Sequence, residues 1–452
     1  MDVKKLTAGS GYDYLTRQVA AMDSTEKGHL SLASYYSAKG ETPGVWVGRG
    51  LGGIEGLDAG DPVTAEQMKA LFGAGYHPLA LQRQAALPPD AEAKDFANAI
   101  SLGQPYRVYT PDVSPFRLEV ARRFADYNTS TGASPTAAVP REERGRIRTE
   151  VAREFFLAEY RREPQDAREL AGLVARLSRP QTTAVAGFDL TFSPVKSVSG
   201  LWALADPSTA AVIERAHQKA MSDALRYIED HALYTRLGRN GVRQVDVKGL
   251  VGAAFTHRDS RASDPDLHTH VAVANKVETL DGRWRSIDGR ILFKATVAAS
   301  ETYNTALERY LATDLGLVFS ARPAPEGKRP VREVVGVDQR LLDRWSTRRK
   351  SIQIKASELA EDFQRVHGRT PTPVEMTNLA DQAWKDTRQA KHAPRALADQ
   401  RAAWRHQAEA VLGGAQAVDA MVGSALHPRA TRAPMPNHDW YRNTAQEIIA
   451  TV

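Results

Sequence analysis

Three histidines, His257, His268 and His270, lie close together in the sequence and have the spacing of metal ligands. His268 and His270 are two apart in LHTHVAVAN, a stretch with strand character, and side chains two apart on a strand point to the same face. Three neutral imidazoles suit a borderline divalent ion, and three protein ligands leave one position open for water or substrate. The pattern therefore favours a catalytic metal site, although a single histidine would more simply be a surface or core residue.

The residues on either side predict how the three histidines meet. GAAFTH alternates before the loop RDSRASDPD, which carries a turn signal at DPD, and alternation resumes in LHTHVAVAN. This pattern predicts a hairpin with a long tip, which returns His257 to the side of His268 and His270. The sequence does not choose the divalent ion: we expect magnesium or manganese first, with zinc or nickel as alternatives.

A carboxylate in another predicted strand is a candidate to orient one of these histidines. In GFDLTF the apolar side chains alternate at Phe188, Leu190 and Phe192, so Asp189 points the other way. A carboxylate inside an apolar strand is costly without a partner, and a metal-bound histidine commonly donates its other ring nitrogen to a carboxylate. An Asp189 at a sheet edge that faces water is an equal alternative.

The N-terminal segment predicts an amphipathic helix that begins near Ser10. Its apolar stripe includes Tyr12 and Leu15, whereas Tyr14 falls on the other side of the helix. Each N-terminal tyrosine taken alone is more simply a packing residue than a reactive group.

The composition is that of an ordinary globular protein. The chain has 452 residues, of which 42% are hydrophobic and 25% charged, and this length suits two or three domains or one elaborated domain. Because cysteine is absent, disulfides and thiolate metal sites are excluded. Neither a signal peptide nor a membrane-spanning apolar stretch is recognisable, so we expect a cytoplasmic location without membrane insertion. The net charge of +6 permits a polyanionic partner without requiring one.

The periodicity along the chain predicts an α+β fold. Strands are expected between about 183 and 290, and the residues from 61 to 180 are mostly helical, with a loop at 129–140. A helix is expected from 207 to 232. Beyond Lys294 the pattern is helical to about residue 317, and from about 335 a polar, Arg-rich helical region runs to the end. The helix start in PVKSVS, with Lys196, could bind a phosphate through its amides. No GxxxxGK[ST] phosphate loop occurs, so no helicase domain is expected.

An ordered set of motifs resembles a known family. GFDLTFSPVKSVS followed by THRDSRASDPDLHTHVAVAN, with YYSAKGETPGVWVGRG before them and GRWRSIDGR and STRRKSIQ after, is similar to the MobF class of conjugative relaxases in the HUH endonuclease superfamily. The resemblance implies a palm made of a central, mainly antiparallel sheet flanked by helices. It divides the chain into a relaxase core at 1–320 and a helical part at 321–452 that closes over DNA.

The resemblance also implies an activity. Such a relaxase nicks single-stranded DNA at the origin of transfer of a plasmid or integrative element. A tyrosine attacks the phosphodiester, which gives a 5′-phosphotyrosine and a free 3′-hydroxyl, and the strand is rejoined later in conjugation. By match to the motifs, His257, His268 and His270 are the metal ligands and Asp189 orients one of them.

The resemblance assigns the nucleophile and the DNA contacts less sharply. Alignment on Leu15 selects Tyr14 as the first nucleophile, and alignment on the first tyrosine selects Tyr12. Tyr35 and Tyr36 match a pair used for a second strand transfer. The expected DNA contacts are Lys196, Arg258 and Arg261.

The implied partners are single-stranded DNA with an adjacent hairpin, accessory relaxosome proteins and a type IV secretion coupling protein, with translocation of the protein into the recipient cell. Larger relatives carry a helicase domain, so this chain is either a piece of such a protein or a stand-alone relaxase. Other classes stay open: a rolling-circle replication initiator or transposase of the HUH type, a histidine-ligated metallohydrolase, and a non-catalytic DNA-binding protein.

Overall fold

The structure is a computed structural model, and it describes residues 1–13, 15, 44–108, 114–178, 183–323, 330–388 and 395–428. The chain divides into two compact units. The larger unit is built from residues 1–105 together with the chain from 185 onward, and the smaller unit is residues 106–184. Among the described residues, no helix has both the length and the apolar character needed to cross a bilayer.

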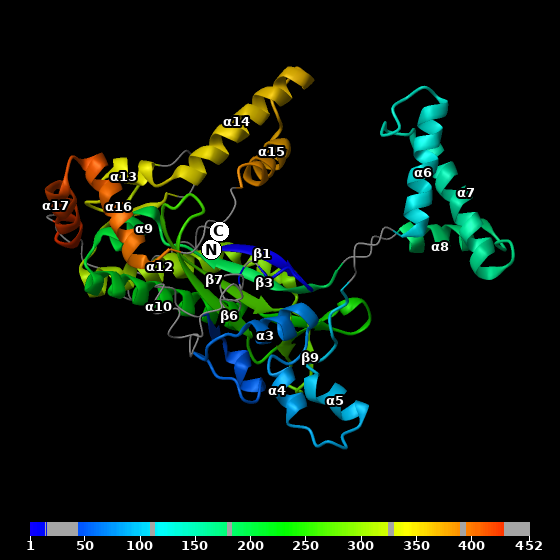
Figure 1. Cartoon of the computed structure of the whole chain (residues 1–452), viewed down its shortest axis with the longest axis horizontal. Coiled ribbons are helices and arrows are strands. Elements are labelled where there is room, and N and C mark those ends of the chain that lie inside the picture. The colour runs from blue at the N-terminus through cyan, green and yellow to red at the C-terminus, as the bar shows by residue number, and fades with distance from the viewer. Residues whose placement is uncertain are drawn as a thin grey trace, which may run out of the picture. The chain divides into compact units, whose positions relative to one another are not determined.

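An antiparallel sheet forms the centre of the larger unit (Figure 1). In the described residues its strand order is β1-β3-β7-β6-β2, and each neighbouring pair is antiparallel. The strands are β1 Asp2–Thr7, β2 Val45–Val47, β3 Val185–Phe192, β6 Gly252–Asp259 and β7 Pro265–Ala274. The expected α+β fold with a mainly antiparallel central sheet is confirmed.

Two strands of this sheet lie outside the region in which strands were predicted. The edge strand β1 reads DVKKLT, and only Val3 and Leu6 of its side chains are buried. Charged residues are common on edge strands because they discourage pairing with other chains, and they also hide the alternation that marks a strand. At three residues, β2 is too short to give a periodic signal.

Helices cover one face of the sheet and form the main core with it. These are α9 Lys196–Leu204, α10 Pro207–His231 and α12 Thr296–Leu315. Leu190, Phe192 and Val271 point from β3 and β7 into this core and are fully buried. Since side chains alternate along a strand, the neighbouring residues of β3 and β7 point to the opposite face.

Short elements connect these layers. The two-stranded pairs are β4 Tyr234–Leu237 with β5 Arg243–Asp246, β8 Val277–Glu278 with β9 Trp284–Arg285, and β10 Phe319–Ala321 with β11 Arg332–Val334. The short helical elements are η1 Arg49–Gly53, α3 Ala65–Met68, η2 Lys69–Ala74, α4 Ala80–Ala85, α5 Ala93–Ile100, η3 Arg239–Gly241 and α11 Gly289–Lys294.

From residue 339 the described part of the chain is helical, as expected, whereas the strand β11 lies within the part from 321 onward that was predicted to be helical. The helices are α13 Gln339–Arg344, α14 Thr347–His367, α15 Pro373–Asp386, α16 Leu397–Leu412 and α17 Ala415–Leu426. The fully buried Trp404 of α16 packs against Trp202 of α9, with ring centroids 5.6 Å apart. Residues of α13, α16 and α17 thus belong to the core of the larger unit, while a functional division at residue 320 stays a prediction.

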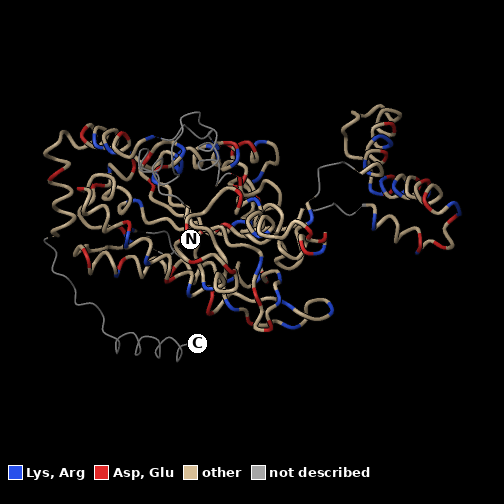
Figure 2. The backbone as a smooth tube through the Cα atoms, turned by 60° about the horizontal axis from the view of Figure 1, so that its bottom comes forward, with Lys and Arg blue, Asp and Glu red and all other residues tan. Residues whose placement is uncertain are grey.

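The smaller unit is a helical insertion with a core of its own. It contains α6 Pro115–Ser130, α7 Arg141–Tyr160 and α8 Ala167–Ser178, and Phe116 and Val151 are buried between them. Acidic and basic residues are interspersed along these helices (Figure 2). One ion pair, Arg123 with Glu154 at 2.9 Å, joins α6 to α7. The helices and the loop at 129–140 agree with the sequence prediction, which did not separate them as a unit.

Candidate metal centre and DNA cleft

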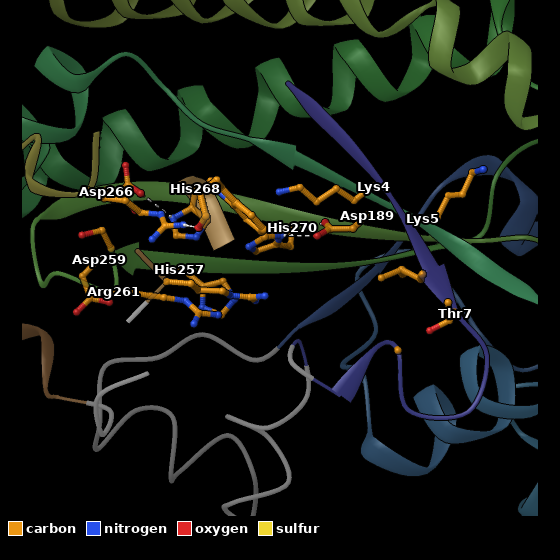
Figure 3. A pocket seen from close by; sticks show the side chains of 16 residues that line it. Lys4, Lys5, Thr7, Asp189, His257, Asp259, Arg261, Asp266, His268 and His270 are labelled. Carbon is orange, nitrogen blue, oxygen red and sulfur yellow. Dashed lines mark hydrogen bonds and ion pairs between the residues drawn. The ribbon is translucent and has the colours of Figure 1, made fainter. Parts of the chain in front are cut away.

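The three histidines lie together on the face of the sheet opposite α10 and α12. His257 of β6 is paired directly with His268 of β7, and His270 follows on the same side of β7. The ring centroids are 5.3 Å apart for His257 and His268, 5.5 Å for His257 and His270, and 5.2 Å for His268 and His270. Their side chains point into one space (Figure 3). The hairpin predicted from the sequence is confirmed.

Hydrogen bonds hold two of the rings in a defined orientation. His270 Nδ1 lies 2.9 and 3.0 Å from the two carboxylate oxygens of Asp189 on β3, and 3.1 Å from Thr191 Oγ1. His268 Nδ1 lies 2.7 Å from the backbone carbonyl oxygen of Asp266. In both rings Nδ1 therefore donates its proton, which leaves the lone pair on Nε2. Burial lowers the pKa of His268, so this ring is neutral, as a metal ligand must be.

The spacing of the rings fits a shared metal ion. An ion bonded to three imidazoles at about 2.1 Å and near-tetrahedral angles would place the ring centroids roughly 5.3 Å apart. Among the described residues, however, no group of three or more histidine, aspartate or glutamate side chains has its donor atoms set to hold a metal ion as they stand. The chemistry of the donor set and the spacing of the rings nevertheless fit a metal ion.

A cleft opens over the histidines and contains an excess of positive charge. Its volume is about 420 Å³, and its lining includes Lys4 and Lys5 of β1, Arg261 of the hairpin tip, Arg348 of α14 and Arg388 after α15. Asp189, Asp259 and Asp266 supply the acidic groups of the lining. The cleft thus places a metal-binding face beside cations from four distant parts of the chain, a combination that suits a phosphate-containing ligand.

Comparison with known proteins identifies the family. A family model described as TrwC relaxase matches residues 8–411, which is most of the chain. The chain belongs to the TrwC relaxase family. The multifunctional conjugation protein TraI of Escherichia coli is 39% identical over 119 residues, which are 25% of this chain and 6% of TraI, so the match spans a small part of that relative.

Two solved structures of the conjugative relaxase TrwC with oriT DNA are also similar. The copper-bound complex is 20% identical, with a TM-score of 0.48, over 91% of this chain and 98% of that chain. The metal-bound complex is 20% identical, with a TM-score of 0.47, over 92% of this chain and 99% of that chain.

Three of the four tyrosines expected as nucleophiles lie outside the described residues. These are Tyr14, Tyr35 and Tyr36. Tyr12 is described: it is buried, its ring centroid lies 6.3 Å from that of Phe72 in η2, and burial raises its pKa to about 12. Leu15 is buried as well, so the two members of the predicted apolar stripe that the structure describes both face the protein interior. Gly11 lines the cleft, which places the start of this segment at the cleft wall.

The helix start at Lys196 does not offer its amides to a phosphate, contrary to the expectation from PVKSVS. The carboxylate of Glu333, from β11, accepts hydrogen bonds from Ser197 N at 3.1 Å and Ser197 Oγ at 2.5 Å, and so occupies the N-terminus of α9. Lys196 Nζ donates to Pro265 O at 3.0 Å and Asp266 Oδ1 at 3.1 Å, so this lysine binds the start of β7, next to the tip of the histidine hairpin.

Of the two arginines predicted to contact DNA, only one lies in the described lining of the cleft. Arg261 lines the cleft, whereas Arg258 is absent from its described lining and lies 3.9 Å from Glu214 of α10. The reason is strand alternation, because Arg258 follows His257 directly and therefore points to the helix side of the sheet.

A buried histidine beneath the metal face was missed by the sequence analysis. His217 of α10 hydrogen-bonds Tyr303 Oη at 2.7 Å through Nδ1 and Thr269 Oγ1 at 2.8 Å through Nε2. Thr269 lies between His268 and His270 and points the other way, so His217 supports the strand from below. Burial lowers the pKa of His217 to about 3. The burial of His217 could have been predicted from its position on the apolar stripe of α10, four residues after Ile213.

The tip of the histidine hairpin is anchored by the distal helices, which the sequence did not indicate. Thr347, at the start of α14, donates to the buried carboxylate of Asp264 from its backbone N and its Oγ1, both at 3.1 Å. Trp404 Nε1 donates to Ser263 O at 2.8 Å. Burial raises the pKa of Asp264. These contacts fix the start of α14 to the metal hairpin and bring Arg348, the next residue, to the cleft.

Proposed function

We propose that this chain is a conjugative relaxase that nicks one DNA strand at an origin of transfer, becomes joined to the cut end through a tyrosine, and later rejoins the strand. One observation carries the proposal: three histidines and an orienting carboxylate lie on the same face of the sheet, in a cleft lined by cations. The segment that bears the N-terminal tyrosines begins at the wall of this cleft. Membership of the TrwC relaxase family supports it.

The metal ligands would be His257, His268 and His270. A bound divalent ion would supply a Lewis acid for one non-bridging oxygen of the scissile phosphate and would offset the charge that develops on phosphorus. Magnesium or manganese is our first expectation, with zinc or nickel as alternatives. Asp189 would hold His270 through Nδ1, as a carboxylate does for a metal-bound imidazole.

The nucleophile would be Tyr14. Its Oη forms a bond to phosphorus as the bond from phosphorus to the 3′-oxygen breaks, and the tyrosine proton ends on the released 3′-hydroxyl. Because one phosphate ester is exchanged for another, the energy of the phosphodiester bond is conserved for rejoining the strand, whereas hydrolysis would dissipate it. Tyr12 is the weaker candidate because its burial against Phe72 shields it and raises its pKa to about 12. Tyr35 and Tyr36 would serve a second strand transfer.

The DNA contacts and the partners follow from the same proposal. Lys4, Arg261 and Arg348 would bind phosphates next to the scissile one, and the distal helices would close over the strand. Lys196 would act on DNA only through the hairpin that it binds, and a contact from Arg258 stays a prediction. A DNA hairpin beside the nick, accessory relaxosome proteins, a type IV coupling protein and passage from the cytoplasm into a recipient cell are further parts of the proposal.

The test is incubation with oligonucleotides and supercoiled plasmids that carry candidate transfer origins, with divalent metal or with EDTA, followed by denaturing gels. We expect a metal-dependent band of protein joined to DNA, which His268→Ala removes. His406→Ala, which changes an exposed histidine of α16, is the matched control and should leave the band intact. Free nicked ends without a protein-linked band would instead indicate a metallohydrolase.

A further inference from the structure

An aromatic side chain with cations around it lies in the wall of the cleft, in a part of the chain where the sequence analysis assigned no site. Trp384, near the end of α15, lines the same cleft as the three histidines. Lys4 Nζ lies 4.9 Å from the centre of its ring, and the guanidinium carbons of Arg348 and Arg388 lie 5.6 and 5.4 Å from it. Trp384 is half-buried, so part of the indole stays accessible from the cleft.

The arginines that line the cleft repel one another. Burial and the charge of Arg388 both lower the pKa of Arg348, and burial, Arg388 and Arg348 lower the pKa of Arg261. Arg348 also donates to the backbone carbonyl oxygens of Trp384 at 3.3 Å and Thr387 at 3.5 Å, which ties α14 to the end of α15. Such a concentration of positive charge is expected where a bound anion relieves the repulsion.

A nucleotide carries both groups that the arginines and the indole would bind. Its phosphates would neutralise the cations, and its base would stack on the indole, because every base has a π-face and tryptophan is the most favourable partner for cations and flat rings. The cleft of about 420 Å³ has the size of a site for one small ligand, and both the indole and the three histidines line it.

We propose that Trp384 is the platform on which a base next to the scissile phosphate stacks, with Arg348 and Arg388 bound to the flanking phosphates. This inference rests on the proposed function, which identifies the bound molecule as single-stranded DNA. It adds a residue, Trp384, that positions this DNA in the cleft. It predicts two separable contributions to binding: one that needs bases and depends on Trp384, and one that needs only phosphates and depends on the arginines.

The test compares two probes of the same length by fluorescence anisotropy, a dT20 oligonucleotide and an abasic 20-mer with the same phosphate backbone, both in EDTA. Trp384→Leu keeps an apolar side chain but removes the ring, and we expect it to bind dT20 at least about fivefold more weakly and the abasic probe unchanged. Trp384→Phe should retain most of the preference for dT20. Arg348→Gln with Arg388→Gln should weaken both probes and reduce the salt slope by about 1.4.

Phe363→Leu is the matched control, because Phe363 lies on α14 with Arg369 5.2 Å above its ring but does not line the cleft as described. It should bind both probes as the unaltered protein does. Circular dichroism melts check that each variant is folded, and Trp384→Phe gives a readout if the leucine variant is not.

Equal binding of the two probes by the unaltered protein, or an equal loss on both probes in Trp384→Leu, would overturn the stacking role. The measurement contains no cleavage step, so its failure leaves the protein-linked DNA band as a separate test. Conversely, absence of that band with normal base-dependent binding would count against the relaxase activity and not against the platform.

Discussion

Replacement of Asp189 should weaken metal binding by an amount that follows from its contacts with His270. The carboxylate is 2% exposed and both of its oxygens lie within 3.0 Å of Nδ1. Asp189→Asn keeps the shape and one acceptor but loses the charge, and a charge-assisted hydrogen bond is about twice as strong as a neutral one. The difference, about 1.4 kcal/mol, corresponds to roughly tenfold weaker metal binding.

Asp189→Ala should have a larger effect. It removes both acceptors and leaves His270 Nδ1 with Thr191 Oγ1 at 3.1 Å, so the ring is held less firmly. Loss of such an orienting group costs up to about 100-fold in metal affinity. For both Asp189 variants, metal affinity is measured by titration calorimetry with Mn²⁺ and by the metal concentration that the protein-linked DNA band requires. The plateau of the band should be the same when metal is saturating.

Asp246→Asn, which changes an exposed carboxylate of β5, is the control for a general effect of charge. If both Asp189 variants bind Mn²⁺ as tightly as the unaltered protein does, the carboxylate does not orient a metal ligand, and the metal centre is wrongly assigned.

Three further predictions concern the supports of the site. Because the pKa of His217 falls from 6.5 unfolded to about 3 folded, its contribution to stability is complete above pH 6.5 and is lost as the pH falls toward 3. Denaturant unfolding at pH 7 and pH 5 should differ by about 2 kcal/mol more in the unaltered protein than in His217→Gln, and an equal difference would contradict the assignment. Asp264→Ala should lower the free energy of unfolding by about 2 kcal/mol through loss of the two Thr347 hydrogen bonds, measured by denaturant titration; an unchanged midpoint would refute the anchor. Tyr12→Phe should leave the yield of protein-linked DNA on denaturing gels unchanged, since the Tyr12 hydroxyl is buried, whereas a lost band would make Tyr12 the nucleophile.

The metal hairpin could be predicted because its information is local. Alternation fixes which side chains share a face, so the positions of His257, His268 and His270 follow once β6 and β7 pair as a hairpin. Alternation also separates Asp189 from its apolar neighbours. Its partner His270 follows only when β3 is known to pair with β7, which is a choice of sheet order that periodicity does not encode.

The rest of the cleft could not be predicted because it depends on contacts between distant segments. Trp384 reads as one aromatic residue in an amphipathic helix, and nothing in its neighbours indicates that Lys4 lies over its ring. The helix start at Lys196 looked open to a phosphate because the capping carboxylate, Glu333, comes from a strand more than a hundred residues away. Side-chain partners at such separations are set by tertiary packing rather than by local pattern.

The most direct test of the central claim is to locate the covalent bond. The protein is incubated with a transfer-origin oligonucleotide and divalent metal, the protein-linked DNA is digested with protease and nuclease, and the peptides are analysed by mass spectrometry. We predict a nucleotide 5′-phosphate on Tyr14, formed with metal and absent with EDTA, together with a free 3′-hydroxyl on the other fragment. Nicked DNA with no modified tyrosine, or a nucleotide on a residue outside the N-terminal tyrosines, would contradict the claim.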